Sequence, residues 1–405
     1  MTRILYLCSS WPHGRSFGGQ LRALHLGRAL KAVGQVTVLA VSSEADDRAA
    51  AEKTAAEFEV LPPILPRPTP SGGLPGKLRR AFSPRCMEVH GVAASVEDAQ
   101  RVAALVGDYD LVWVLNSRTP NILRRWHWPR SHLDLDDVPS TYLRTVAQSG
   151  EAPAQRWKAR LQQRLMHRRE RLFAERFSTL SVCSQPDKDY LGGGDRIHVI
   201  PNGFERPAIE PTYNPPAGPP RIGFIGLYSY APNADGVQWF LRECWPQLRQ
   251  AVPGIRLRLI GKDTDGPAGP QGPDVDGLGW VADSAAEIAT WSAMIIPIRF
   301  GGGTRIKIAE AFSRKCPAVS TRLGAFGYEV QDGRQLRLAD QPADFAQACV
   351  ELVRDRNQAR AIAEQAWSEF LTTWTWDAIA PAVQTAAANC LALHRASPSI
   401  TRHHA

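Results

Sequence analysis

The chain has 405 residues, of which 44% are hydrophobic and 22% are charged, and its formal net charge is +8. This composition is that of a globular protein long enough for two buried cores, and it excludes a largely disordered chain. The positive charge favours anionic partners, such as nucleotides, nucleic acid or acidic lipid, without choosing among them.

The first half of the chain alternates short apolar runs with helical patterns. The first run, Ile4–Cys8, is too short for the core of a signal peptide and is typical of a buried strand. Helices are predicted over Gln20–Ala32 and Val96–Val106. Strands are predicted at Ile4–Leu7, Val36–Val41, Leu111–Leu115, His132–Leu135, Leu180–Cys183 and His198–Pro201. This alternation predicts a parallel sheet covered by helices.

A proline-rich stretch, Arg206–Pro220, interrupts the pattern and is predicted to be a linker. The alternation then restarts, with strands predicted at Ile222–Ile225, Leu257–Ile260, Ile295–Ile298, Ala318–Ser320 and Leu336–Leu338. We therefore expect an α/β protein with two doubly wound, Rossmann-like domains. Their predicted bounds are residues 1–205 and 221–365, joined by the linker 206–220 and followed by mainly helical residues 366–405, with Ser397–Ala405 frayed.

The segment with the most chemical information is 295–330, in which a predicted buried strand is followed by three glycines and a helix. The glycines are Gly301, Gly302 and Gly303, and the helix is expected to begin near Thr304. Glycines let the backbone come close to a ligand, and the N–H groups and dipole at a helix N-terminus attract anions.

Arg305 and Lys307 fall in the predicted first turn of this helix. A cation is unfavourable there unless an anion binds nearby, so the pattern predicts a diphosphate-binding loop. Glu310 follows on the same helix, where a carboxylate can accept hydrogen bonds from a ribose diol. The alternative is a glycine-rich turn, a solvated basic helix start and a solvent-exposed Glu310.

The same segment resembles the donor-site signature of glycosyltransferase family 4, a retaining family with the GT-B fold. The resemblance implies two Rossmann-like domains that face a central cleft, with a C-terminal helix that crosses back to the first domain. That signature has two glutamates, the second within a helix that ends in a Gly-x-Pro-Val-Val-type strand. Glu310 matches the second glutamate and Lys315–Thr321 matches the strand, whereas Gly302 stands where the first glutamate is usual. The sequence GGGTRIK at 301–307 resembles a subgroup often found in exopolysaccharide or cell-surface glycan assembly.

The resemblance also implies where the donor diphosphate is neutralised. Family members usually carry Arg and Lys in the loop after the first strand of the C-terminal domain, but Ile222–Phe240 contains neither. We expect Arg305 and Lys307 to supply this charge from the opposite side of the phosphates. The resemblance places Gly226, in the same loop, in the donor site as well.

On the acceptor side, Ser9–Leu26 resembles the first strand, loop and helix of the family, which implies that Gly18, Gly19 and Arg22 face the cleft. The alternative is a glycine turn before a helix. Residues 184–191 and 197–205 resemble the end of the family's N-terminal domain, although Pro201-Asn202-Gly203 alone predicts only a turn.

The sequence Asp134-Leu135-Asp136-Asp137 contains a DxD pair, which chelates Mn²⁺ or Mg²⁺ in the other major glycosyltransferase fold. GT-B enzymes ordinarily use helix dipoles and basic side chains instead. We therefore predict no metal site, and we expect Asp137 to orient an acceptor hydroxyl or to have a structural role.

The stretch Arg156–Arg176 is a basic helical pattern with an apolar stripe. It indicates either a helix that binds a membrane surface or nucleic acid, or a packed helix with solvated arginines, and we favour the second interpretation. Nucleic acid is not a predicted partner. Peripheral contact with the inner face of a membrane fits a lipid-linked acceptor.

The resemblance implies a retaining, hexosyltransferase-type glycosyltransferase that needs no cofactor, with Arg305, Lys307 and Asp137 as catalytic residues. The amides of Gly301–Thr304, with Arg305 and Lys307, would stabilise the charge of the leaving phosphate. No enzymic nucleophile is evident, which is consistent with a front-face mechanism. The donor would be a nucleoside-diphosphate sugar and the acceptor a hydroxyl of a glycan or lipid-linked sugar.

Two other functions stay open: a nucleotide-sugar epimerase on the same scaffold, and a non-catalytic nucleotide- or glycan-binding protein. Seven scattered cysteines without a CxxC pair indicate free thiols in a reducing cytoplasm. The sequence contains no run of about 18 apolar residues, so no membrane-spanning helix is predicted.

Overall fold

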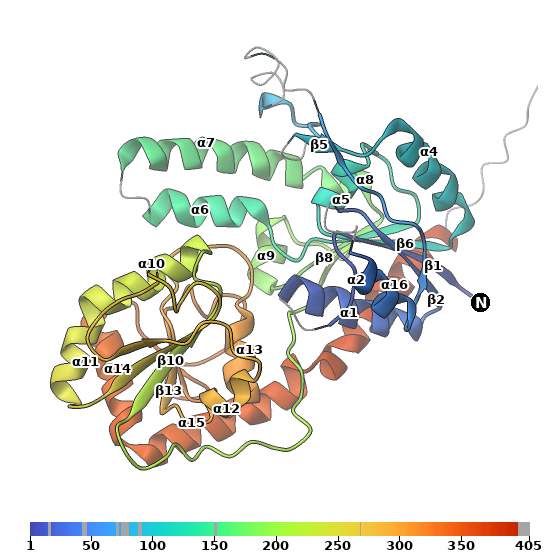
Figure 1. The fold of residues 1–405 in the computed structure, drawn as a ribbon. Coiled ribbons are helices and arrows are strands. Elements are labelled where there is room, and N and C mark those ends of the chain that lie inside the picture. Colours follow the sequence, from blue (N-terminus) through green and yellow to red (C-terminus); the bar gives the residue numbers. More distant parts are fainter. Residues whose placement is uncertain are drawn as a thin grey trace, which may run out of the picture. The chain divides into compact units, whose positions relative to one another are not determined.

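The computed structural model describes residues 1–14, 18–42, 47–69, 73, 81–87, 91–149, 152–267 and 269–395 (Figure 1). It divides into two compact units. The first comprises 1–140, 160–201 and the chain from Ile379 onward, and the second comprises 141–159 and 202–378. These bounds differ from the predicted ones because residues 141–159 are grouped with the second unit and residues 379–395 with the first. The predicted frayed tail, Ser397–Ala405, lies outside the described residues.

The first unit is built on a parallel sheet with the order β3-β2-β1-β6-β7-β8-β9. Its strands are β1 (Arg3–Cys8), β2 (Gln35–Ala40), β3 (Glu59–Val60), β6 (Leu111–Leu115), β7 (Ser131–Asp134), β8 (Thr179–Val182) and β9 (Ile197–Val199). An antiparallel pair, β4 (Arg67–Pro68) and β5 (Val92–Ala93), lies outside this sheet. The strands predicted in the first half are confirmed to within a few residues, and the short edge strand β3 was not predicted.

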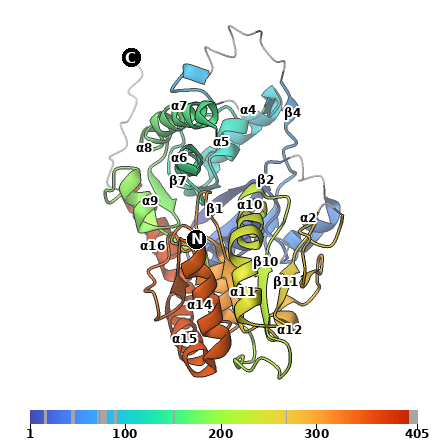
Figure 2. The same cartoon turned by 90° about the vertical axis from the view of Figure 1, so that its left-hand side faces the viewer.

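Helices connect these strands, as the alternating pattern predicts. They are α1 (Gly18–Lys31), α2 (Arg48–Ala55), α4 (Val96–Leu105), the 3₁₀ turn η2 (Val106–Asp108), α5 (Arg118–Ile122), α8 (Phe173–Arg176) and α9 (Gln185–Tyr190). Two further helices, α6 (Pro139–Ser149) and α7 (Pro153–Glu170), each contain residues of both units and run side by side (Figures 1 and 2). Ser95 accepts from the N–H of Asp98 and so explains where α4 begins.

The second unit has a parallel sheet with the order β12-β11-β10-β13-β14-β15. Its strands are β10 (Arg221–Ile225), β11 (Arg256–Ile260), β12 (Val275–Gly277), β13 (Ala293–Ile296), β14 (Ala318–Ser320) and β15 (Arg337–Leu338). Its helices are α10 (Ala231–Trp239), the π-helical turn η3 (Phe240–Cys244), α11 (Trp245–Ala251), α12 (Ser284–Ile288), α13 (Ile306–Ser313), α14 (Pro342–Arg354), α15 (Arg356–Glu369) and the π-helical turn η4 (Phe370–Trp374). The long α16 (Trp376–Arg395) begins in this unit, and its residues from Ile379 belong to the first.

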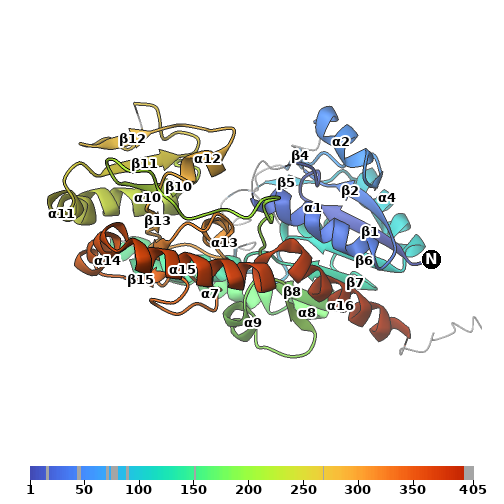
Figure 3. The same cartoon turned by 90° about the horizontal axis from the view of Figure 1, so that it is seen from below.

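Both faces of the second sheet are buried, as expected for a parallel sheet. Along β13, Ala293 and Ile295 belong to one hydrophobic cluster, whereas Met294 and Ile296 belong to another. Helices α10, α11 and α14 cover the first face (Figure 2). Helices α13 and α15 contribute to the second and lie against each other (Figure 3). Successive side chains of a strand therefore point to opposite faces of the sheet, and helices cover both faces.

The predicted linker, Arg206–Pro220, contains no helix or strand, in agreement with its proline content. It is nevertheless anchored, since Tyr213 is buried and its hydroxyl donates to the carbonyl oxygen of Ser292 at 3.1 Å. Among the described residues, no helix has the length and hydropathy needed to cross a membrane.

Candidate functional site

The candidate site lies at the carboxyl ends of β10 and β13 in the second unit. These strands are parallel neighbours, with Ile222 opposite Ala293, although β11 and β12 separate them in the sequence. After β10 the chain continues into α10 on one face of the sheet, and after β13 it continues into α13 on the opposite face. The strands that follow, β11 and β14, lie on opposite sides of this pair, which makes the position a topological switch point. Ligands of open α/β sheets bind at the carboxyl ends of the strands at such points. Gly226 follows β10 directly, and the glycine-rich loop Gly301–Thr304 follows β13.

Lys307 of α13 points its ammonium group at the loop after β10. Its Nζ donates to Oδ1 of Asn233 at 2.8 Å and lies 4.8 Å from the centroid of the Phe224 ring. A Cβ atom on Gly226 would lie 3.0 Å from Lys307 Nζ and 2.8 Å from Nδ2 of Asn233. Gly226 is therefore needed for space: a side chain there would displace both polar groups.

Burial, and to a smaller extent the positive charge of Arg305, lower the pKa of Lys307 to about 7. No carboxylate in the described parts of the chain forms an ion pair with Lys307. Its hydrogen-bonding partner is the neutral amide of Asn233, which nothing in the sequence pattern indicated. A cation without a counter-ion in a desolvated position is one that a bound anion would stabilise.

The glycine-rich loop has the backbone of an anion-binding turn. Gly301 and Gly303 have φ values of +138° and +68°, which L-residues rarely adopt. Arg305 folds back on the loop and donates to the carbonyl oxygens of Gly302 and Gly303. Within the described residues, the backbone N–H groups of Gly302, Gly303 and Thr304 donate to no protein acceptor. Three adjacent N–H groups of this kind, directly before a helix, are suited to a phosphate.

Two details differ from the sequence prediction. Helix α13 begins at Ile306, so Arg305 is its N-cap residue and only Lys307 lies in the first turn. The N–H of Gly301 is not available to a ligand, because it donates to Oγ1 of Thr145 at 2.9 Å. The predicted cradle of four amides is therefore reduced to the three that follow Gly301.

Glu310 lies one turn after Lys307 on α13 and is buried, with an exposed fraction of 9%. Burial raises the pKa of its carboxyl group, and Oε1 accepts from the hydroxyl of Ser284 at 3.3 Å. The alternative of a solvent-exposed glutamate is wrong. Thr304 is fixed from a different segment, since Nδ2 of Asn202 donates to its hydroxyl at 3.0 Å. Asn202 thus does more than form the turn that Pro201-Asn202-Gly203 predicted.

The acceptor-side residues belong to the first unit. Gly18 and Gly19 form the first turn of α1, and residues 15–17 before them lie outside the described residues. Asp137 follows β7 and is exposed. The structure therefore brings the predicted donor-side residues together within the second unit, whereas Gly18, Gly19, Arg22 and Asp137 belong to the first.

The expectation that Arg22 faces the cleft on the acceptor side is wrong, because its side chain is completely buried. Its guanidinium donates to both carboxylate oxygens of Asp134, at 2.8 and 2.6 Å, and to the carbonyl oxygens of Ile200 and Pro201 at 3.0 and 3.1 Å. A fully buried side chain cannot face an acceptor. Arg22 instead joins α1 to the ends of β7 and β9, a role invisible in sequence because Asp134 is 112 positions away.

The first aspartate of the DxD pair is the ion-pair partner of Arg22. The carboxylate of Asp134 is occupied by Arg22 and by the hydroxyl of Ser181, which donates to it at 2.6 Å. Asp136 has a φ of +58°, and its Oδ1 lies 3.8 Å from Nε of Arg22. Within the described ranges, no group of three or more His, Cys, Asp or Glu side chains is placed to hold a metal ion.

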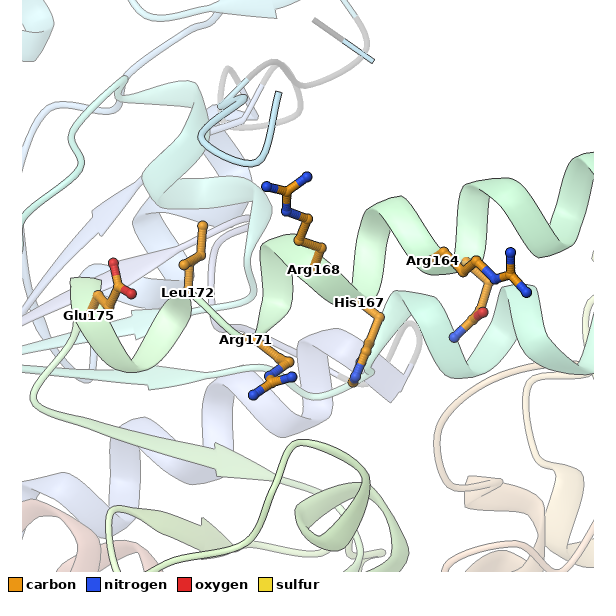
Figure 4. A pocket seen from close by; sticks show the side chains of 7 residues that line it. Arg164, His167, Arg168, Arg171, Leu172 and Glu175 are labelled. Carbon is orange, nitrogen blue, oxygen red and sulfur yellow. The ribbon is translucent and has the colours of Figure 1, made fainter. Parts of the chain in front are cut away.

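The basic helix α7 lines a pocket of about 430 Å³ in the first unit. The lining residues are Gln163, Arg164, His167, Arg168, Arg171, Leu172 and Glu175. In Figure 4, Arg168 and Arg171 point to opposite sides of the chain and Arg164 points away from both. The cations do not converge on one point, so this pocket is a poor site for a single phosphate and is better described as a basic surface.

Comparisons with known proteins point to the same part of the chain. Residues 219–355, which are 137 of the 405, match the protein family described as "Glycosyl transferases group 1". This match covers the loop after β10, the glycine-rich loop and α13, and it supports a glycosyltransferase. No curated protein shows significant sequence similarity to the chain.

Solved structures share the whole fold at low identity. The sucrose-phosphate synthase of Thermosynechococcus elongatus is 17% identical with a TM-score of 0.68, and the alignment covers 98% of this chain and 100% of that one. HepE of Anabaena, solved in complex with UDP-glucose, is 17% identical with a TM-score of 0.60, over 95% and 99% of the chains. WaaG, a glycosyltransferase involved in lipopolysaccharide biosynthesis, is 14% identical with a TM-score of 0.60, over 94% and 99%. The likeness confirms the predicted α/β fold of the GT-B class.

Proposed function

We propose that this chain is a retaining glycosyltransferase that moves a sugar from a nucleoside-diphosphate sugar to a hydroxyl of a glycan or lipid-linked acceptor. The observation that carries the proposal is the presence, on one edge of the sheet, of three backbone N–H groups and an ammonium group: within the described residues the N–H groups donate to no protein acceptor and the ammonium forms no ion pair. Both lie at the switch point of the sheet, inside the stretch that matches the glycosyltransferase family. HepE, which shares the fold, was solved with UDP-glucose.

In this proposal the diphosphate of the donor binds against the loop Gly302–Thr304. The N–H groups there would stabilise charge on the leaving phosphate together with Lys307, while Arg305 supports the loop and adds positive potential. Because these groups are already in position, they need little reorganisation during the reaction. Glu310, on the next turn of α13, would accept hydrogen bonds from the ribose of the nucleotide.

The proposed acceptor side lies in the first unit, where the exposed Asp137 follows β7 and would orient the acceptor hydroxyl. Retention without an enzymic nucleophile requires the acceptor to attack from the face that the phosphate leaves, with that phosphate taking the acceptor's proton. The occupied carboxylate of Asp134 favours charge compensation by Lys307 and Arg305 over a metal held by the DxD pair.

The proposed location is the cytoplasm, with peripheral contact at the inner face of the membrane. All seven cysteines are free, which fits a reducing compartment. Helix α7 presents exposed arginines and an exposed Trp157, a combination suited to the interface of an anionic bilayer. A surface enzyme of this kind would act in exopolysaccharide or cell-surface glycan assembly.

The proposal is tested by incubating the protein with UDP-, GDP-, ADP- and CDP-sugars and following the donor by NMR. We expect one class of donor to release its nucleoside diphosphate, with the first product keeping the anomeric configuration of the donor. The variant Lys307→Met should lose most of this activity. Arg242→Ala removes an equal charge from an exposed pair with Glu243 and should retain it.

Other outcomes of the same experiment identify the alternatives. A change in the sugar without release of the nucleoside diphosphate would indicate an epimerase. Binding without any change in the donor would indicate a non-catalytic binding protein. Inversion of the anomeric configuration would contradict the retaining mechanism while leaving the donor site intact.

A further inference from the structure

Helix α6 contacts the glycine-rich loop through two residues that no sequence motif indicates. Oγ1 of Thr145 accepts from the N–H of Gly301 at 2.9 Å and lies 3.1 Å from the carbonyl oxygen of the same residue. The hydroxyl group of Thr145 can donate its one hydrogen either to this carbonyl oxygen of Gly301 or to the carbonyl oxygen of Tyr142, which lies 2.8 Å away. The bond accepted from Gly301 therefore does not depend on where this hydrogen points.

Tyr142, one turn earlier on α6, lies directly against Gly302. A Cβ atom on Gly302 would lie 3.0 Å from Cβ of Tyr142 and 3.2 Å from its backbone N. The rings of Tyr142 and Phe300 pack edge to face, with their centroids 6.3 Å apart. Gly302 is not held in the left-handed region of φ, so its lack of a side chain is explained by the space that α6 occupies.

We propose that Thr145 and Tyr142 of α6 are positioning residues that set the conformation of the donor-binding loop. This inference rests on the function proposed above. Thr145 occupies the N–H of Gly301, so the next three N–H groups remain for the diphosphate. Tyr142 packs against Gly302, and so favours glycine over the glutamate usual at this position.

The physical reason lies in the cost of ordering the loop. Glycines lose more conformational entropy on ordering than other residues, so an unsupported loop with three of them would be expensive to fix when a ligand binds. Here the loop is supported at both ends: Thr145 binds Gly301, and Asn202 donates to Thr304 at 3.0 Å. Between these points Arg305 donates to the carbonyl oxygens of Gly302 and Gly303. A loop fixed in advance binds phosphate without the ordering cost.

The test compares nucleoside diphosphate with nucleoside monophosphate binding by calorimetry, using whichever of UDP, GDP, ADP or CDP binds the wild type. Thr145→Val keeps the shape of the side chain but cannot accept from Gly301, whereas Thr145→Ser keeps the acceptor. We expect Thr145→Val to weaken diphosphate binding by about tenfold or more and monophosphate binding by much less. Thr145→Ser should stay close to the wild type.

Ser149→Ala is the matched control, because it removes a hydroxyl of the same helix that donates to the carbonyl oxygen of Thr145 and not to the loop. Gly302→Ala disturbs the contact between the loop and α6 by placing a Cβ atom against Tyr142. It should weaken diphosphate binding while Thr145 is intact. It decides the matter if Thr145→Val fails to fold, as judged by thermal denaturation.

The failures are distinguishable. If the wild type binds a diphosphate and both Thr145→Val and Gly302→Ala bind it equally well, the positioning role is overturned and the proposed function stands. Equal losses for diphosphate and monophosphate would also overturn it, since a general structural defect has that effect. If the wild type binds no nucleotide, the proposed function fails, and the inference fails with it.

Discussion

The protonation of Lys307 should be coupled to nucleotide binding. In the free protein burial lowers the pKa of Lys307 to about 7, against an ordinary value of 10.5. At pH 8.5 most molecules therefore hold a neutral amine at this position. A bound diphosphate brings negative charge next to Nζ and raises the pKa again, so binding should take up close to one proton per site.

The magnitude follows from this linkage. Above the free pKa, affinity should fall by up to about tenfold for each pH unit, which is about thirtyfold between pH 7.5 and pH 9. In this range the phosphates of the nucleotide are already ionised and do not contribute. The change should stop where the pKa of Lys307 in the complex is reached.

The assay is calorimetric titration of a nucleoside diphosphate in two buffers with different ionisation enthalpies. Proton uptake makes the observed enthalpy depend on the buffer, and Lys307→Gln should bind more weakly at pH 7.5 and lose this dependence. Arg305→Ala removes the second cause of the lowered pKa, so the fall in affinity should move to higher pH. Proton uptake that is unchanged in Lys307→Gln, or absent from the wild type, would refute this role for Lys307.

Three further predictions concern stability, measured by urea denaturation. Arg22→Met should cost about 3–5 kcal/mol because it leaves Asp134 charged and buried, and adding Asp134→Leu should recover part of the loss; a cost below about 1 kcal/mol would contradict this. Burial raises the pKa of Glu170 from 4.5 to about 7, so the folded state holds this proton more tightly than the unfolded state does. Stability should therefore fall by up to about 3 kcal/mol as pH rises through this window, and Glu170→Gln should abolish that fall; an unchanged pH profile would exclude Glu170 as its source. Gly223→Ala would place a Cβ 2.2 Å from the Trp291 ring and should cost about 1–3 kcal/mol, whereas a neutral effect would show that the core can adjust.

Much of the fold could be predicted from sequence because it depends on local patterns. A strand buried on both faces is a continuous apolar run, and Ile295 and Ile296 of β13 belong to clusters on opposite faces. The edge strands β3 and β12 were missed, since Glu59–Val60 and Val275–Gly277 are short and only partly buried. Their formation depends on pairing with β2 and β11 rather than on their own composition.

The candidate site was predictable only where its residues are close in sequence. The glycine-rich loop, Arg305 and Lys307 form one motif, and the structure finds them at one edge of the sheet. Thr145 contacts Gly301 across 156 positions and Asn233 contacts Lys307 across 74, and neither residue type is unusual in its own segment. Such partners are determined by packing, which a single sequence does not encode in any local pattern.

Arg22 shows why a correct motif can still give a wrong role. Its position after two glycines at the start of a helix matched a ligand-facing loop, but the pattern carries no information about burial. The side chain is completely buried because Asp134 lies within reach at the end of a neighbouring strand. A charged residue near a predicted site is therefore a candidate for a structural ion pair until its partner is known.

The central claim is that Gly302–Lys307 binds the diphosphate of a nucleotide donor. The most direct measurement is calorimetric titration of UDP, GDP, ADP and CDP into the wild type, Lys307→Met and the exposed-charge control Arg242→Ala. The account predicts micromolar binding of one nucleotide, unchanged in Arg242→Ala and weakened at least tenfold in Lys307→Met, which corresponds to about 1.4 kcal/mol. Equal binding by all three proteins, or binding of no nucleotide by the wild type, would contradict it.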